Sequence, residues 1–282
     1  MNPEISERSM PHSAEALWSW HGGSGVLIWQ LMFSGNDMVM GIKRCARRRA
    51  ATLFCLESST GCVLRDNFVL TGGGETDLPV GEGWMTGLET THGNLLFCHA
   101  YQPGSPEHQG IWAVDLVGNG IVWSRPDLVY AANLGDSLLA YRPKVFAGFP
   151  ERDYWLIDPL SGRELDHPGL EHERTNRLRL MAESEQERQG IMLPDSGFDE
   201  SGQVEHIDCG DWRANAFHRM RNEKDGTVLW ESFLTVTAGD RLLYEDKMAS
   251  SETMPVFNNF LIRKKRLYYI KEKESLISVA VS

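Results

Sequence analysis

The stretch CLESSTGCVLR, residues 55–65, shows most clearly how the chain is built. An apolar segment that begins at Ala51 runs into the polar corner Ser-Ser-Thr-Gly and leaves it through a second short apolar segment. Two apolar segments on either side of a polar turn are typical of a β-hairpin, and Gly61 stands where a left-handed backbone conformation is needed. The stretch therefore predicts two antiparallel strands.

The same pattern returns along the chain. Apolar segments flank Gly-containing corners at residues 118–120, 161–162 and 225–226, and an earlier corner at 24–25 precedes VLIW. The five copies can be aligned on the eleven-residue frame of residues 55–65. The last position of this frame is then occupied by Trp29, Arg65, Trp123, Asp166 and Trp230, which are 36, 58, 43 and 64 residues apart. A degenerate repeat of about 40–50 residues, with one antiparallel unit per copy, predicts a β-propeller.

Residues 19–230 resemble the tryptophan-docking repeat of quinoprotein-type (PQQ-type) propellers, in which a strand, an Asp, small residues, Thr-Gly and a closing Trp follow one another. The Asp position is filled by Asp115 and Asp158, with Glu57 and Asn222 in its place in two other copies. The resemblance implies the propeller fold and invites quinone chemistry. The sequence has neither the adjacent cysteines nor an evident Asp/Asn calcium cluster of those enzymes, so we expect the fold without a cofactor.

The length of 282 residues suits a single all-β propeller of about six blades (five to seven), each a four-stranded antiparallel sheet of about 45 residues. The polar composition of residues 1–15 predicts a disordered N-terminal tail, and the propeller domain would span residues 16–282. The last segment, SLISVAV, should pair with the N-terminal unit, because a propeller joins its first and last blades to remove exposed edges. Residues 171–211 fit a degenerate blade or an insertion, and both remain open.

The acidic composition limits the partners of the chain. A net charge of −11 and a pI of about 5.3 argue against nucleic acid or an anionic membrane as the partner. The N-terminus has no apolar centre typical of a secretory signal, and no apolar run is long enough to span a bilayer. Cys55, Cys62 and Cys98 stand in strand-like segments that favour reduced thiols. We expect a cytoplasmic protein of undetermined oligomeric state.

The sequence motifs of common enzymes are missing: GxxxxGK[ST], GxSxG, HExxH and a GxGxxG that opens a helix. A metal site can be sketched from His206, Cys209 and His218, with Asp208 and Asp211 nearby, but no second ligand pair has matching spacing, so no metal site is predicted. These absences favour a scaffold or interaction protein over an enzyme. The alternative is a propeller hydrolase or quinoprotein-like oxidoreductase, with a metal or quinone at the channel mouth.

Strand parity suggests a binding surface. Successive turns of a four-stranded blade alternate between its two faces, so the connections at residues 43–49, 102–110 and 143–153 should gather on one face. That face would receive eight cationic side chains: Lys43, Arg44, Arg47, Arg48, Arg49, Arg142, Lys144 and Arg152. Guanidinium groups suit bidentate contacts with carboxylate or phosphate. We predict that this face binds an acidic protein or a small anion; the alternative is a set of solvated hairpin tips. No catalytic residue is predicted.

Overall fold

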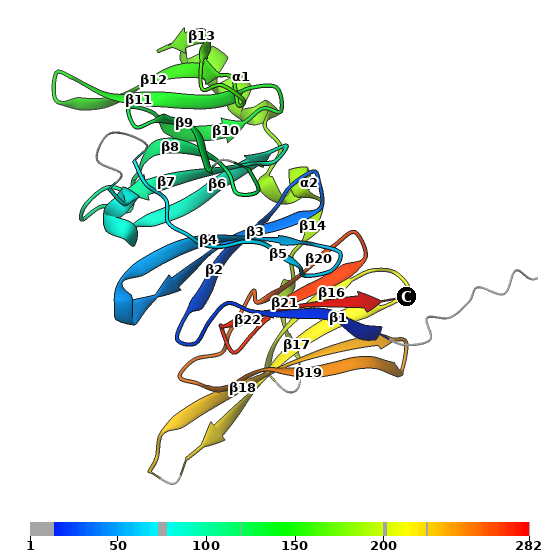
Figure 1. Cartoon of the computed structure of the whole chain (residues 1–282). Coiled ribbons are helices and arrows are strands. Elements are labelled where there is room, and N and C mark those ends of the chain that lie inside the picture. The colour runs from blue at the N-terminus through cyan, green and yellow to red at the C-terminus, as the bar shows by residue number, and fades with distance from the viewer. Residues whose placement is uncertain (1–13, 73–77, 119, 200–201, 224, 282) are drawn as a thin grey trace, which may run out of the picture. The chain divides into compact units, whose positions relative to one another are not determined.

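The computed structural model describes residues 14–72, 78–118, 120–199, 202–223 and 225–281, and their strands form five antiparallel sheets of four or five strands (Figure 1). The fold class is therefore confirmed as an all-β propeller, with a number of sheets inside the expected range. The chain divides into two compact units: Gly22–Gln189, and Met1–His21 together with Gly190–Ser282. One propeller domain over 16–282 stays a prediction, and residues 1–13 of the predicted tail lie outside the described residues.

The unit Gly22–Gln189 contains three four-stranded sheets in which spatial order follows chain order. The first consists of β2 (Leu27–Phe33), β3 (Met38–Cys45), β4 (Ala50–Glu57) and β5 (Val63–Phe68). The second consists of β6 (Thr86–His92), β7 (Leu95–Tyr101), β8 (His108–Asp115) and β9 (Gly120–Arg125). The third consists of β10 (Val129–Asn133), β11 (Leu138–Phe146), β12 (Phe149–Ile157) and β13 (Glu164–Gly169), followed by helices α1 (His172–Met181) and α2 (Glu185–Gln189).

The sequence corner at residues 55–65 is the β4–β5 turn. Gly61 donates its backbone N–H to Glu57 O over 2.8 Å, at a φ of 72° that only glycine adopts easily. The β12–β13 turn is built in the same way, because Gly162 donates to Asp158 O over 2.9 Å. The repeated sequence pattern therefore corresponds to a repeated turn geometry.

The last position of the frame joins neighbouring sheets. Trp123 donates its indole N–H to Pro159 O over 2.9 Å, and Arg65 donates Nε–H to Leu116 O over 3.0 Å. Both carbonyls follow the Asp position of the next copy. Trp29 differs, since half of its surface is exposed. The quinoprotein-type resemblance is thus confirmed at the level of the propeller fold.

Strand β7 has a nearly continuous apolar sequence because it packs on both sides. Leu96 and Cys98 belong to the core shared with the first sheet, whereas Leu95 and Phe97 belong to the core shared with the third. Successive residues of a strand point to opposite faces, so one strand supplies both cores. Phe97 is fully buried, which stabilises the fold by about 1.5–3 kcal/mol.

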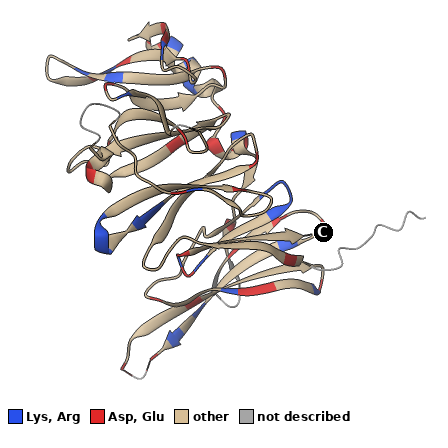
Figure 2. Ribbon diagram, viewed as in Figure 1, with Lys and Arg blue, Asp and Glu red and all other residues tan. Residues whose placement is uncertain are grey.

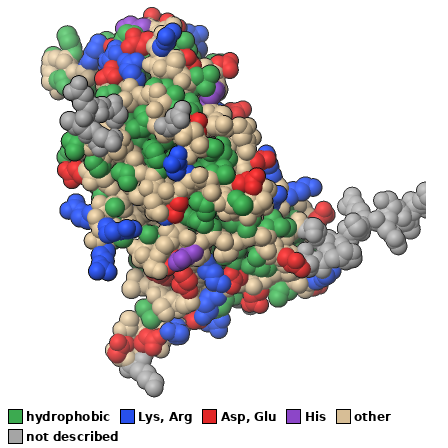
Figure 3. Space-filling view, viewed as in Figure 1, with side chains coloured by type: hydrophobic (Ala, Val, Ile, Leu, Met, Phe, Trp, Pro, Cys, Tyr) green, Lys and Arg blue, Asp and Glu red, His purple; other side chains and the backbone are tan. Residues whose placement is uncertain are grey.

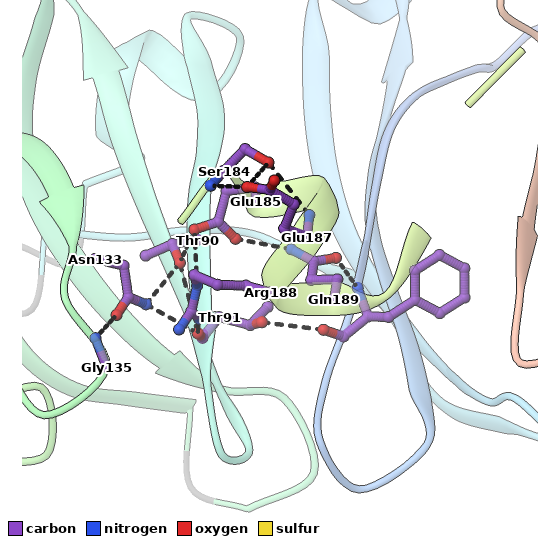
Figure 4. A network of polar contacts seen from close by, with 10 residues as sticks. Thr90, Thr91, Asn133, Gly135, Ser184, Glu185, Glu187, Arg188 and Gln189 are labelled. Carbon is purple, nitrogen blue, oxygen red and sulfur yellow. Dashed lines mark hydrogen bonds and ion pairs between the residues drawn. The ribbon is translucent and has the colours of Figure 1, made fainter. Parts of the chain in front are cut away.

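Helix α2 links the first strands of the three sheets through polar contacts (Figure 4). Gln189 Oε1 accepts the backbone N–H of Phe33 at the end of β2 (2.7 Å). Glu185 Oε1 accepts the hydroxyl of Thr90 on β6 (2.6 Å), and Asn133 on β10 donates to the same hydroxyl oxygen (2.8 Å). In the part of the chain that the structure describes, no helix combines the length and apolar character that spanning a membrane requires.

The other unit holds two sheets. One has the order β1 (Ala14–His21), β22 (Ser275–Val281), β21 (Arg266–Lys271), β20 (Phe260–Arg263) and β14 (Ile191–Met192). The second runs in chain order through β15 (Asp195–Asp199), β16 (Gly202–Asp208), β17 (Arg213–Asn222), β18 (Val228–Ala238) and β19 (Arg241–Glu252). Ala14 lies opposite Val281, which confirms the predicted pairing of the last strand with the N-terminal unit.

The segment 171–211 contains both a helical insertion and strands. Residues 172–189 form α1 and α2, and the strands from Ile191 onward belong to the two sheets of the second unit. Helix α1 could not be predicted from the residue pattern because it buries only Thr175 and has no apolar stripe.

Candidate active site

The candidate site is a buried carboxylate that contacts two histidines from the neighbouring strands. Glu89 lies on β6, His99 on β7 and His108 at the start of β8. Glu89 Oε1 is 2.8 Å from His99 Nδ1 and 2.7 Å from His108 Nδ1. The Glu89 side chain is 8% exposed and that of His99 1%, whereas His108 is 36% exposed. His108 is therefore the member of the cluster that a substrate can reach.

A β-bulge directs the Glu89 side chain. Leu88 pairs with Cys98 and Thr90 with Phe97, so that Glu89 is an extra, unpaired residue on β6. Bulges of this kind re-aim a side chain and are common beside active sites. The first strands of three other sheets break register at the same place, at Leu17, Trp29 and Ala131. Among these four positions, only Glu89 carries a charge.

Close packing fixes the two imidazole rings. The rings of His99 and His108 stack with centroids 3.5 Å apart and planes 10° apart, and Tyr101 lies edge-on to both. A Cβ at Gly87 would be 2.6 Å from the His99 ring, so glycine is required there. His99 Nδ1 is close to Glu89 but is not aligned for a hydrogen bond, and within the described residues its Nε2 has no partner either.

The cluster shifts the affinity of its members for protons. Burial alone would raise the pKa of Glu89, but the hydrogen bond from His108 and the close approach of the His99 ring outweigh it and lower that pKa. The hydrogen bond to Glu89 raises the pKa of His108, against the effect of burial. Glu89 therefore stays ionised, and His108 holds its proton more tightly than a free histidine. Such a pair can deliver a proton to a substrate.

The three residues also form a potential metal-ligand set, since their donor atoms lie within 4.8 Å of one another. Two histidines and a carboxylate are a common zinc or iron ligand set. An ion must lie in the plane of each imidazole that binds it, however, and the two rings here are stacked in nearly parallel planes. The arrangement therefore fits a shared proton better than a metal ion.

A cavity of about 750 Å³ opens beside His108. It is lined by the β7–β8 connection, the β11–β12 hairpin and helix α1, all within one unit. Its polar side chains include Gln102, Glu107, His108, Tyr141, Lys144, Glu151, Arg152, Tyr154, His172, Asn176 and Arg179. A pocket of this size holds a small molecule.

The β3–β4 hairpin carries five of the predicted cationic residues. Lys43 is buried, with Nζ 2.7 Å from Asp66 Oδ1. The Arg44 guanidinium makes cation–π contacts with the rings of Trp29 (4.7 Å) and Trp84 (5.6 Å). Arg47, Arg48 and Arg49 are exposed at the hairpin end, where basic residues colour the ribbon in Figure 2 and basic side chains project in Figure 3. Their binding role stays a prediction, and Lys43 and Arg44 have structural contacts.

The other three cationic residues lie on the β11–β12 hairpin. Arg142 contacts Asp127 Oδ2 (2.9 Å) and Glu164 Oε1 (2.7 Å). Lys144 Nζ is 2.7 Å from Asp153 Oδ2. The Arg152 guanidinium lies 4.8 Å from the centre of the Tyr141 ring. Lys144 and Arg152 line the cavity, so two of the eight predicted residues lie at the candidate site.

The sketched metal set is not brought together. His206 lies near Asp208, with a 3.8 Å contact, and both are partly exposed. His218 is buried; its Nδ1 is 2.8 Å from Ser232 Oγ and its Nε2 is 3.8 Å from Glu205 Oε2. Because Glu205 and His206 are neighbours on one strand, they point to opposite faces. His206 and His218 therefore lie in different surroundings and do not form one ligand set.

The sequence analysis missed Glu89, His99 and His108. The available signal was His99, which stands inside the apolar strand sequence LLFCHAY. A buried histidine needs a polar partner, and this one is 1% exposed. The identity of the partner depends on the bulge in β6, which no linear motif records.

Neither a protein-family model nor a curated protein matches the chain. The chain is similar to a solved structure of a putative glycoside hydrolase from Bacteroides ovatus (10% identity, 99% of this chain and 95% of that chain, TM-score 0.34). It is also similar to the mannose phosphorylase MPT-4 from Leishmania mexicana (11%, 96% and 89%, TM-score 0.29). A third match is the β-propeller domain of the Trilobed protease from Pyrococcus furiosus (10%, 90% and 71%, TM-score 0.27).

These matches correct one expectation. Glycoside hydrolases and mannoside phosphorylases recur among the matched structures, which contradicts the prediction of a non-catalytic scaffold or interaction protein. The prediction relied on the absence of linear enzyme motifs. Glu89, His99 and His108 come from three strands, so their grouping leaves no such motif. The cytoplasmic location and a protein partner stay predictions.

Proposed function

We propose that the chain is an enzyme whose active site is the cavity beside His108, and that His108 exchanges a proton with the substrate. One observation carries this proposal: a buried carboxylate, Glu89, holds a histidine that lies at the wall of a cavity of about 750 Å³. The reaction class is group transfer by general acid–base catalysis, either to water or to a small acceptor such as phosphate.

The roles follow from the contacts. Glu89 engages His108 Nδ1, which fixes the ring and leaves Nε2 for the substrate. Glu89 also stabilises the imidazolium form, as a carboxylate does in a catalytic triad. His99 stacks on His108 and prevents rotation of its ring. A positioned acid or base of this kind contributes about 10²–10⁴-fold to a rate.

The proposal does not extend to a quinone cofactor. The tryptophan-docking geometry of Trp123 and Arg65 is a feature of the fold, and the proton chemistry of Glu89 and His108 requires no electron acceptor. The first substrates to assay are aryl glycosides, which release a coloured phenol on hydrolysis, because several of the matched structures are named as glycoside hydrolases.

The test measures release of 4-nitrophenol from a panel of 4-nitrophenyl glycosides, with and without inorganic phosphate. His108→Gln should lower kcat/KM at least about 100-fold. Glu89→Gln should also lower kcat/KM. In the pH–rate profile of this variant, the pKa of the group that must be protonated, His108, should be lower than in the wild type. His206→Gln, a change at a partly exposed histidine of the other unit, is the control and should leave activity unchanged. Wild-type activity in His108→Gln would refute the proposal.

A further inference from the structure

We infer that the cavity binds an amphipathic small molecule, with its polar group at His108 and an aryl or acyl group against the end of the β11–β12 hairpin. The inference rests on the proposed function for the location of the polar group. It adds the chemical class of the ligand and the side chains that select it.

The apolar part of the site is a projecting arm. Strands β11 and β12 pair from Leu138–Ile157 as far as Phe146–Phe149. The neighbouring strand β10 pairs only up to Tyr141, and β13 only up to Tyr154. Residues 142–153 therefore form a two-stranded arm beyond the rest of the sheet (Figure 1). Its turn is Ala147 and Gly148, both with positive φ, as two-residue hairpins require.

The end of the arm exposes large apolar side chains. Val145 is 77% exposed, Phe146 69% and Phe149 73%, and Figure 3 shows hydrophobic side chains at this end of the molecule (upper left). Clustered exposed apolar groups mark ligand or partner sites. Val145 and Phe149 line the cavity, together with the rings of Pro143 and Pro150. One wall of the cavity is therefore apolar.

The opposite chemistry is present in the same cavity. His108, Glu107 and Arg152 line it as well. Within the described residues, Arg152 has no carboxylate partner at ion-pair distance, and its guanidinium rests on the Tyr141 ring instead. A wholly polar ligand would leave Phe149 in water, and a wholly apolar ligand would offer Arg152 and His108 no polar partner. An amphipathic ligand satisfies both walls.

The hairpin offers a matched pair of variants. Phe146 and Phe149 lie opposite each other, with similar exposure, but only Phe149 lines the cavity. The probe is 1-anilinonaphthalene-8-sulfonate, which joins an aromatic body to an anionic group, and binding to the full chain is followed by fluorescence titration. Phe149→Ser should weaken binding about tenfold or more, the effect of losing one large apolar contact. Phe146→Ser should change it less than about twofold.

Equal effects of Phe146→Ser and Phe149→Ser, or no effect of Phe149→Ser, would overturn the inference. Circular dichroism and the Tm of each variant establish that it is folded. The two proposals fail separately. Loss of turnover in His108→Gln without an effect of Phe149→Ser on probe binding defeats only the amphipathic ligand. Selective loss of probe binding in Phe149→Ser with full turnover in His108→Gln defeats only the proton-transfer role.

Discussion

Replacing Glu185 with alanine should lower the free energy of unfolding by about 3 kcal/mol, since this one carboxylate serves three donors. Glu185 Oε1 accepts hydrogen bonds from Thr90 Oγ1 (2.6 Å) and Arg188 Nε (3.2 Å), and Oε2 accepts one from Gln189 Nε2 (2.9 Å). The contacts lie where helix α2 joins the first strands of the sheets (Figure 4).

The magnitude follows from the burial of the partners. Thr90 is fully buried and Gln189 is 7% exposed, so water cannot replace the lost acceptor for either. A hydrogen bond to a charged group contributes about 1.5–3 kcal/mol. Two such losses, with some relaxation of the helix, give about 3 kcal/mol, which lowers the Tm of a chain of this length by about 6–12 °C.

Urea unfolding followed by tryptophan fluorescence measures this change. The control is Glu187→Ala on the same helix, where the hydrogen bonds of the carboxylate to described residues go to the exposed Ser184, and little change is expected. If the unfolding midpoint of Glu185→Ala equals that of Glu187→Ala, the polar contacts of α2 do not hold the sheets together and the reasoning is refuted.

Three further predictions concern the packing and charge of the same unit. Gly87→Ala should destabilise the protein by about 1–3 kcal/mol in urea unfolding, because the new methyl group would meet the enclosed His99 ring at 2.6 Å. Trp123→Phe should cost about 1 kcal/mol, since it removes the hydrogen bond to Pro159 O and keeps an aromatic ring. Hydrogen bonds from two arginines lower the pKa of Asp127 to about 2. The resulting stability is present above the unfolded pKa of about 3.9 and is lost as the pH falls from there toward 2. Asp127→Asn should therefore flatten the fall of Tm over that interval.

Each of these has a result that would contradict it. Gly35→Ala, where the methyl group meets nothing within 4 Å, is the control for Gly87→Ala, and equal midpoints would show that the His99 ring can move aside. Trp29→Phe, at a half-exposed tryptophan, should be nearly neutral. If Trp29→Phe lowers the free energy of unfolding as much as Trp123→Phe does, the stabilisation does not come from the hydrogen bond of Trp123 to Pro159 O. An unchanged acid profile in Asp127→Asn would exclude the arginine contacts as its cause.

Local chemistry made the fold predictable, and tertiary register made the site unpredictable. The turn at Gly61 follows from backbone preferences of a few residues, and its recurrence indicates the propeller. The pairing of β22 with β1 follows from the need to cover sheet edges. Glu89 reaches His99 and His108 only because β6 has an extra residue at that point. A bulge reverses the alternation on which strand reasoning depends, so the sequence pattern gave no sign of the cluster.

The basic loops show a similar division. Strand parity predicted that three connections gather on one face, and two of them, β7–β8 and β11–β12, line one cavity. It could not reveal that Lys43 lies buried against Asp66, or that Arg142 contacts two carboxylates. Formal charge counted along a sequence overstates a basic surface, because ion pairs form between residues that are distant in the chain.

The central claim is that Glu89 holds His108 as a proton donor at the cavity. The most direct test is an NMR pH titration of the histidine side chains in the wild type and in Glu89→Gln. We predict that the His108 imidazole titrates above the ordinary value of about 6.5 in the wild type, as its hydrogen bond to Glu89 requires. Its pKa should fall in the variant. A His108 pKa at or below 6.5 in the wild type, or one unchanged by Glu89→Gln, would contradict the claim.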